Sequence, residues 1–175
     1  MSRITPPSTG QNDTTREIML ADAAATQKLG GVLAGLVAPQ DVIALWGDLG
    51  AGKTSLARAI IQTLLAALGQ HEDVPSPTFT LVQTYEADAL PIWHADLYRL
   101  SDPDELIELG LEEALEAGVL LIEWPDRMED ELPAQRLDIE LKEVGEGRLA
   151  CLTARGVSWE DRIDRAQEQM NQLGA

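Results

Sequence analysis

The sequence predicts a three-layer α/β fold in which a mixed, mainly parallel sheet carries antiparallel hairpins at its edges. Three observations predict it. An apolar run at residues 42–46 leads into a glycine-rich loop and then a helix at residues 55–68 without Pro or Gly. A second apolar run, at residues 119–122, is typical of a strand buried on both faces of a parallel sheet. Alternating segments near residues 78–98 and 136–154 indicate two hairpins.

The remaining elements follow from caps, breakers and periodicity. Residues 1–16 are rich in Ser, Thr, Pro and Asn, and we expect a loose tail there. Asp22 is a plausible N-cap for a helix. Strands are expected at residues 17–20, 78–85, 91–98, 136–142 and 148–154, and helices at residues 23–36, 104–108, 111–117 and 159–173. The main domain would then span residues 17–155, followed by a helical extension over residues 156–175.

The loop after the first buried strand matches the phosphate-binding pattern G-x-x-x-x-G-K-[ST] without a gap. Its glycines let main-chain N–H groups approach phosphate oxygens, and the helix N-terminus adds positive potential. In this pattern Lys53 bridges the outer phosphates and the Thr54 hydroxyl ligates Mg²⁺. The sequence therefore predicts a P-loop NTPase fold that binds a nucleoside triphosphate. The predicted phosphate-binding residues are Gly47, Asp48, Leu49, Gly50, Ala51, Gly52, Lys53, Thr54 and Ser55.

A phosphate loop needs a carboxylate to hold Mg²⁺, usually at the end of a neighbouring buried strand. Glu123 directly follows the apolar run at residues 119–122, and Asp96 follows another apolar stretch in the same manner. Asp96 could hold a magnesium-bound water or orient the attacking one. A hydroxyl at Thr78 could sense the terminal phosphate, although a plain turn explains it equally well. For the nearby His94, a hydrogen-bonded packing role is the favoured interpretation.

The composition argues against nucleic-acid binding, membrane association, thiol chemistry and zinc binding. The formal net charge is −17, and the 13 Lys and Arg residues are scattered, so we expect no strong direct binding of nucleic acid. No apolar stretch approaches the length of a membrane span, which predicts a soluble, cytoplasmic protein without membrane association. The single cysteine, Cys151, lies in an alternating run and is expected to be a buried, inert thiol. Two histidines and one cysteine give no zinc-ligand spacing.

Four further segments combine with the phosphate loop into a recognisable set. They read SPTFTLV at residues 76–82, HADLYRL at 94–100, ELGL at 108–111 and LIEWP at 121–125. In this order and spacing they resemble the bacterial TsaE family over roughly residues 17–155. Only the phosphate loop is generic, whereas the Ser-Pro-Thr, His-x-Asp-Leu-Tyr-Arg and Glu-Trp-Pro combinations are specific to that family.

The resemblance implies a Mg²⁺-dependent ATPase needed to make threonylcarbamoyladenosine, the modified base beside the anticodon of certain tRNAs. It also implies partners, the TsaB and TsaD proteins, whose complex turns over with the support of ATP hydrolysis. By position it makes Lys53 and Thr54 the phosphate and magnesium residues and Glu123 a magnesium ligand. The other residues that it implies are Asp96 as a functionally important acid, Thr78 in a switch-like segment, Thr26 and Arg148 near the nucleotide, and Trp124, for which a core role and a functional role stay open.

Two other functions remain open at this stage. The chain could be a nucleotide-gated binding module with negligible turnover, whose task is conformational. It could also be a small-molecule kinase built on the same loop, but such enzymes generally close a basic lid over the acceptor, and the sequence has no Arg-rich lid segment.

Overall fold

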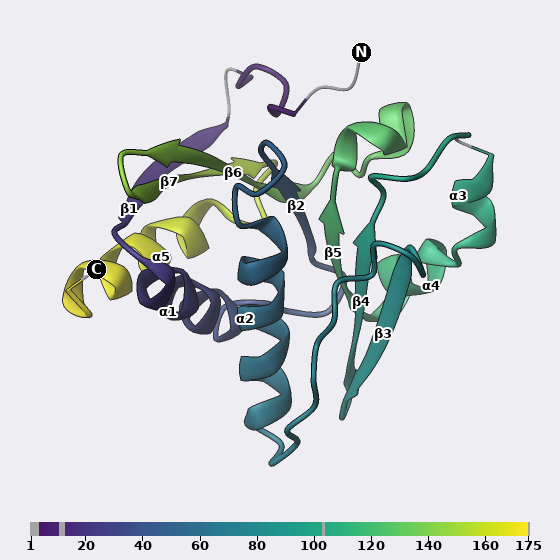
Figure 1. Cartoon of the computed structure of the whole chain (residues 1–175), viewed down its shortest axis with the longest axis horizontal. Coiled ribbons are helices and arrows are strands. Elements are labelled where there is room, and N and C mark those ends of the chain that lie inside the picture. Colours follow the sequence, from purple (N-terminus) through teal and green to yellow (C-terminus); the bar gives the residue numbers. More distant parts are fainter. Residues whose placement is uncertain (1–3, 11–12, 103, 175) are drawn as a thin grey trace.

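The computed structural model describes residues 4–10, 13–102 and 104–174. Within these residues it has seven strands: β1 Thr14–Leu20, β2 Val42–Trp46, β3 Val82–Ala87, β4 Leu90–Asp96, β5 Val119–Glu123, β6 Arg136–Val144 and β7 Gly147–Arg155. They form one sheet in the order β1-β7-β6-β2-β5-β4-β3. The central strands β6, β2, β5 and β4 run parallel, and the outer pairs are antiparallel. The predicted mixed sheet with antiparallel edge hairpins is confirmed (Figure 1).

Helices cover both faces of this sheet and make the three predicted layers (Figure 1). One face carries α1 Ala23–Ala34, α2 Lys53–Ala66 and α5 Glu160–Gln172. The other carries the short helices α3 Glu105–Glu108 and α4 Leu111–Ala117. A 3₁₀ segment, η1 Pro125–Glu131, follows β5. Each face has its own apolar cluster, so the sheet is buried from both sides.

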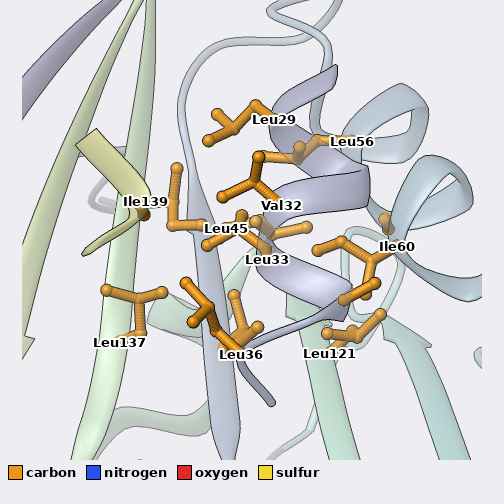
Figure 2. Packing of buried hydrophobic residues seen from close by; sticks show 14 of the residues in the cluster. Leu29, Val32, Leu33, Leu36, Leu45, Leu56, Ile60, Leu121, Leu137 and Ile139 are labelled. Atoms are coloured by element: carbon orange, nitrogen blue, oxygen red, sulfur yellow. The ribbon is translucent and has the colours of Figure 1, made fainter. Parts of the chain in front are cut away.

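The apolar runs form strands here because a central parallel strand has no solvated face. All five residues of β2 and all five of β5 are buried. On the larger face, Leu45 of β2 and Leu121 of β5 meet side chains of α1 and α2 such as Leu33 and Ile60, as Figure 2 shows. This packing holds the carboxyl ends of β2 and β5 next to the start of α2, where the glycine-rich loop lies.

Two strand predictions need correction at their ends. The strand expected from residue 78 begins at Val82, because Leu81 adopts a left-handed φ of 63° and its N–H donates to the Pro77 carbonyl. Thr78 therefore lies in a turn that precedes the strand. The second strand of this hairpin ends at Asp96 instead of residue 98.

The N-terminal tail is shorter than expected. Residues 1–3 and 11–12 lie outside the described part, but β1 already begins at Thr14, since the whole segment from residue 14 to 20 pairs with β7. The Ile4 carbonyl accepts a hydrogen bond from Gly47 N–H at 2.8 Å, and the Ser8 carbonyl accepts one from Arg155. Part of the predicted tail is thus attached to the sheet and to the loop.

The C-terminal helix also belongs to the main core. Trp159, just before α5, is fully buried together with Ile163 and Ala166. Arg162 donates to the Leu36 carbonyl and to Asp41, and its guanidinium lies 3.9 Å from the Trp159 ring centroid. No helix within the described ranges is long and apolar enough to cross a membrane.

The burial of Trp159 gives a stability prediction. Trp159→Ala should lower the free energy of unfolding by about 3–5 kcal/mol, because it removes a fully buried aromatic side chain and leaves a cavity. Val157→Ala is the control, since Val157 is 74% exposed and its loss should change stability by less than about 0.5 kcal/mol. Urea denaturation measures both, and equal losses would mean that the C-terminal segment is not part of the core.

Candidate functional site

The glycine-rich loop connects β2 to α2 and is shaped by its first glycine. Gly47 has a φ of 133°, and a Cβ added there would lie 2.6 Å from the Leu141 carbonyl oxygen. Gly52 is the N-cap of α2, and no side chain caps that helix. The first N–H groups of α2 therefore point toward the loop without a capping side chain, which is the arrangement that favours an anion.

Lys53 is held inside the loop. Its Nζ donates to the carbonyl oxygens of Gly47 and Asp48, each at 2.7 Å, and lies 4.2 Å from the Trp124 ring centroid. The side chain is only 4% exposed. Burial lowers the pKa of the Lys53 ammonium, and the nearby carboxylates of Glu123 and Asp96 oppose that shift. The result is a positive charge fixed at the base of the loop.

Glu123 is the last residue of β5 and joins the loop to the sheet. It pairs with Leu45 of β2 on one side and with Asp96 of β4 on the other. Its Oε2 accepts a hydrogen bond from Thr54 Oγ1 at 2.7 Å, and its Oε1 lies 2.7 Å from His94 Nε2. Glu123 is only 2% exposed, and each of its carboxylate oxygens has a partner, so its position is well defined.

Asp96 ends the adjacent strand and faces the turn that contains Thr78. Its Oδ2 accepts from Thr78 Oγ1 at 3.1 Å, and its Oδ1 accepts from Tyr98 N–H at the same distance. Thr78 also shares a hydrogen bond with Ser76. The structure thus brings Asp96 and Glu123 to one edge of the sheet, as parallel strand ends require.

A cavity of about 290 Å³ gathers these side chains. Nine predicted site residues line it, from the loop, from the turn at Thr78 and from the two strand ends, and Tyr98, Arg99 and Trp124 complete the lining. The nine are Leu49, Gly50, Gly52, Lys53, Thr54, Ser55, Thr78, Asp96 and Glu123. Asp48 contributes its carbonyl oxygen to Lys53 instead. The cavity presents two cationic side chains, Lys53 and Arg99, two carboxylates and several hydroxyl groups next to a helix N-terminus.

Thr26 and Arg148 lie in a different place. They line a second cavity of about 290 Å³ between α1, the loop and the β6–β7 hairpin. Arg148 donates from Nε to the Ala51 carbonyl at 3.1 Å, so the hairpin contacts the loop directly. Gly52 and Ser55 line both cavities, which places the loop between them. The structure brings Thr26 and Arg148 to the loop but not to Glu123.

The sequence assigned no definite site role to His94 or to Trp124. The hydrogen-bonded packing role expected for His94 is confirmed, because the imidazole is fully buried and its partner is Glu123. Its alternation with Asp96 on one strand face is the sequence feature that places it beside the site. Trp124, left open between two roles, has a left-handed φ of 57°. Its ring centroid lies 4.8 Å from that of Tyr98 in a tilted arrangement, and the Lys53 Nζ lies over its ring. Such a conformation is uncommon for a non-glycine residue, and it places the indole at the cavity.

A parallel α/β core with a glycine-rich loop between its first parallel strand and the following helix defines a P-loop NTPase-like fold. The particular family follows from comparison with known proteins. Residues 20–150 match the family model described as threonylcarbamoyl adenosine biosynthesis protein TsaE, and the chain belongs to this family. The resemblance found in the sequence is confirmed, and the chain is therefore a protein of tRNA threonylcarbamoyladenosine biosynthesis.

Individual relatives agree with this assignment. The tRNA threonylcarbamoyladenosine biosynthesis protein TsaE of Rickettsia felis is 38% identical over 150 residues, which cover 86% of each chain. The protein of the same name from Bacillus subtilis is 39% identical over 137 residues, covering 77% of this chain and 83% of the relative. The crystal structure of Bacillus subtilis YdiB matches with a TM-score of 0.72 at 28% identity, covering 95% of this chain and all of that one.

The loop geometry predicts unequal costs for two glycine substitutions. Gly145→Ala, in an open turn at φ 59°, should lower the free energy of unfolding by about 1 kcal/mol through backbone strain alone. Gly47→Ala should cost at least about 2 kcal/mol, since the added methyl also meets the Leu141 carbonyl. Urea denaturation compares the two, and an equal cost would contradict the close approach at Gly47.

Proposed function

We propose that this chain is a Mg²⁺-dependent ATPase that acts with TsaB and TsaD in threonylcarbamoyladenosine biosynthesis. The observation that carries the proposal is the hydrogen bond between Thr54 and Glu123, beside the buried Lys53. It joins the hydroxyl at the start of α2 to a strand-end carboxylate, which is the pairing that holds magnesium in P-loop enzymes. The proposal includes a cytoplasmic location, because the tRNA that such a pathway modifies is made and used there.

The donor set fits Mg²⁺. Thr54 offers a hydroxyl, and Glu123 and Asp96 offer carboxylates, all of them the oxygen ligands that this ion prefers. In the described part of the chain, no group of three or more His, Cys, Asp and Glu side chains could hold a metal by itself. That is the usual situation for Mg²⁺, which takes one or two carboxylates together with substrate phosphates. Bound there, the ion would neutralise charge on the phosphate oxygens.

The remaining side chains have separate tasks in this proposal. The Lys53 ammonium has three N–H groups and uses two of them on loop carbonyls, so one is left for a phosphate oxygen. Asp96 either orients the attacking water or transmits the position of the Thr78 turn, and both tasks fit its contacts. Thr26 and Arg148 would contact the nucleoside end of ATP in the second cavity.

A second candidate is a nucleotide-gated binding module without appreciable turnover. The same contacts support this candidate. Asp96 already accepts hydrogen bonds from Thr78 and from the Tyr98 N–H, so the turn at Thr78 could change conformation when a nucleotide binds. The two functions differ in whether ATP is consumed in the presence of partners.

Phosphate release separates these two functions. With purified TsaB–TsaD we expect stimulation of about tenfold or more, since partner proteins commonly complete P-loop active sites. A lack of stimulation, with intact ATP binding, would contradict the ATPase proposal and support the binding module. The chain alone and TsaB–TsaD alone are the controls. Phosphorylation of a metabolite by the purified chain would instead point to a kinase.

Two substitutions test the assigned roles within the site. Lys53→Ala should weaken ATP binding by about 10- to 100-fold, because it removes a charge-assisted hydrogen bond to phosphate. Glu123→Gln should lower partner-stimulated turnover by about 100-fold while Mg²⁺-free nucleotide binding stays within about threefold.

The matched control for Glu123→Gln is Glu116→Gln, which removes the same charge from an exposed position. Calorimetry and phosphate release measure binding and turnover. Normal hydrolysis by Glu123→Gln would refute the magnesium assignment.

A further inference from the structure

We propose that His94 is a positioning residue, which holds the Glu123 carboxylate in the orientation that presents its second oxygen to Thr54 and to Mg²⁺. The inference rests on the proposed function, because it concerns the same magnesium site. It adds a residue that neither the phosphate-loop pattern nor the strand-end carboxylates point to.

His94 and Thr54 hold the two oxygens of the Glu123 carboxylate from two different elements. In the parallel pair of β4 and β5, His94 lies opposite Leu121 and Asp96 lies opposite Glu123. His94 therefore precedes Asp96 by two residues on the same face of β4. From there its side chain can reach diagonally across to Glu123 on the neighbouring strand. Nε2 of His94 lies 2.7 Å from Oε1, while Thr54 Oγ1 lies 2.7 Å from Oε2. Each oxygen has its own partner on a different element, which fixes the plane of the carboxylate.

The His94 imidazole is the donor in its contact with Glu123. An ionised carboxylate only accepts hydrogen bonds, so the proton in this contact sits on Nε2. His94 is fully buried, and its Nδ1 has no hydrogen-bond partner among the described residues. Among the described residues, the imidazole is thus hydrogen-bonded through one edge, to Glu123. A residue that only filled core volume would need no polar atom here, and a buried polar atom is costly.

His94 reaches the site only through Glu123. Its side chain does not line the cavity formed by the loop and the strand ends, so it would not touch the nucleotide. Removing His94 leaves Oε1 buried without a donor, and the carboxylate is then free to turn away from Thr54. Hydrogen bonds of this outer kind commonly change metal affinity by about 10- to 100-fold. The Mg²⁺ dependence of the site should therefore change, while phosphate contacts of the loop stay as they are.

The test uses the full chain and a fluorescent ATP analogue titrated with Mg²⁺. His94→Leu removes the donor and keeps most of the volume, and His94→Asn keeps an amide that is too short to reach Glu123. Both substitutions should raise the Mg²⁺ concentration that gives half of the maximal fluorescence change of the bound analogue by about tenfold or more. Mg²⁺-free binding of the analogue should stay within about threefold of the wild-type value. His94→Gln, whose amide N–H extends to about the same reach as Nε2, should restore the Mg²⁺ dependence.

Ile92→Val is the matched control, because Ile92 is fully buried on the same strand but lies opposite Val119, four residues before Glu123. Circular dichroism at the assay temperature checks that every variant is folded. A wild-type Mg²⁺ dependence in His94→Leu and His94→Asn would overturn the inference and leave the proposed function standing. Equal losses in all three His94 variants, with Mg²⁺-free binding lost in parallel, would also overturn it. If the wild-type chain bound the nucleotide equally well with and without Mg²⁺, the magnesium site itself would be refuted.

Discussion

The site depends on three parallel strands that end at the same level. Glu123 of β5 lies between Leu45 of β2 and Asp96 of β4, and it meets Thr54 at the start of α2. A slip of one residue in either pairing would turn the carboxylate to the opposite face of the sheet, away from α2. The hydrophobic clusters on the two faces prevent such a slip, because every residue of β2 and β5 is buried and has a defined side. The packing of the core therefore fixes the strand register, and the strand register fixes the geometry of the site.

A buried ion network fixes the other side of the loop. Asp138 is fully buried and accepts hydrogen bonds from Arg136, Arg155 and the Trp46 indole N–H. Since Trp46 is the last residue of β2, this network sets where the strand ends and the loop begins. Removing one partner from such a network leaves an uncompensated buried charge, which is strongly destabilising. Two of the scattered basic residues of an acidic chain thus serve its interior.

The sequence was sufficient for the parallel core because its signals are local. The apolar runs of β2 and β5, the glycine pattern of the loop and the acids after each strand can be read without knowing any contact. The contacts that could not be read join distant segments. β1 begins at Thr14 because it pairs with β7, and α5 is held through Arg162 and Asp41, more than a hundred residues apart. Nor does any local pattern show that Leu81 takes a left-handed conformation, because of which β3 begins only at Val82. His94 belongs to the same group, since its partner comes from another strand.

The charges of the cavity explain why a cation belongs in the proposed reaction. Lys53 and Arg99 face it together with Asp96 and Glu123, so the formal charges of its lining cancel. Arg99 is also stacked on the ring of Phe79, which directs its guanidinium to an aromatic face. A triphosphate brought to such a lining would find its charge balanced by Lys53 and the N-terminus of α2, and opposed by two carboxylates. A divalent cation held by Thr54 and these carboxylates would convert that repulsion into attraction. The acids that would hold Mg²⁺ would therefore also make nucleotide binding stronger with Mg²⁺ than without it. A residue that orients Glu123 would control both the binding of Mg²⁺ and this Mg²⁺ dependence of nucleotide binding.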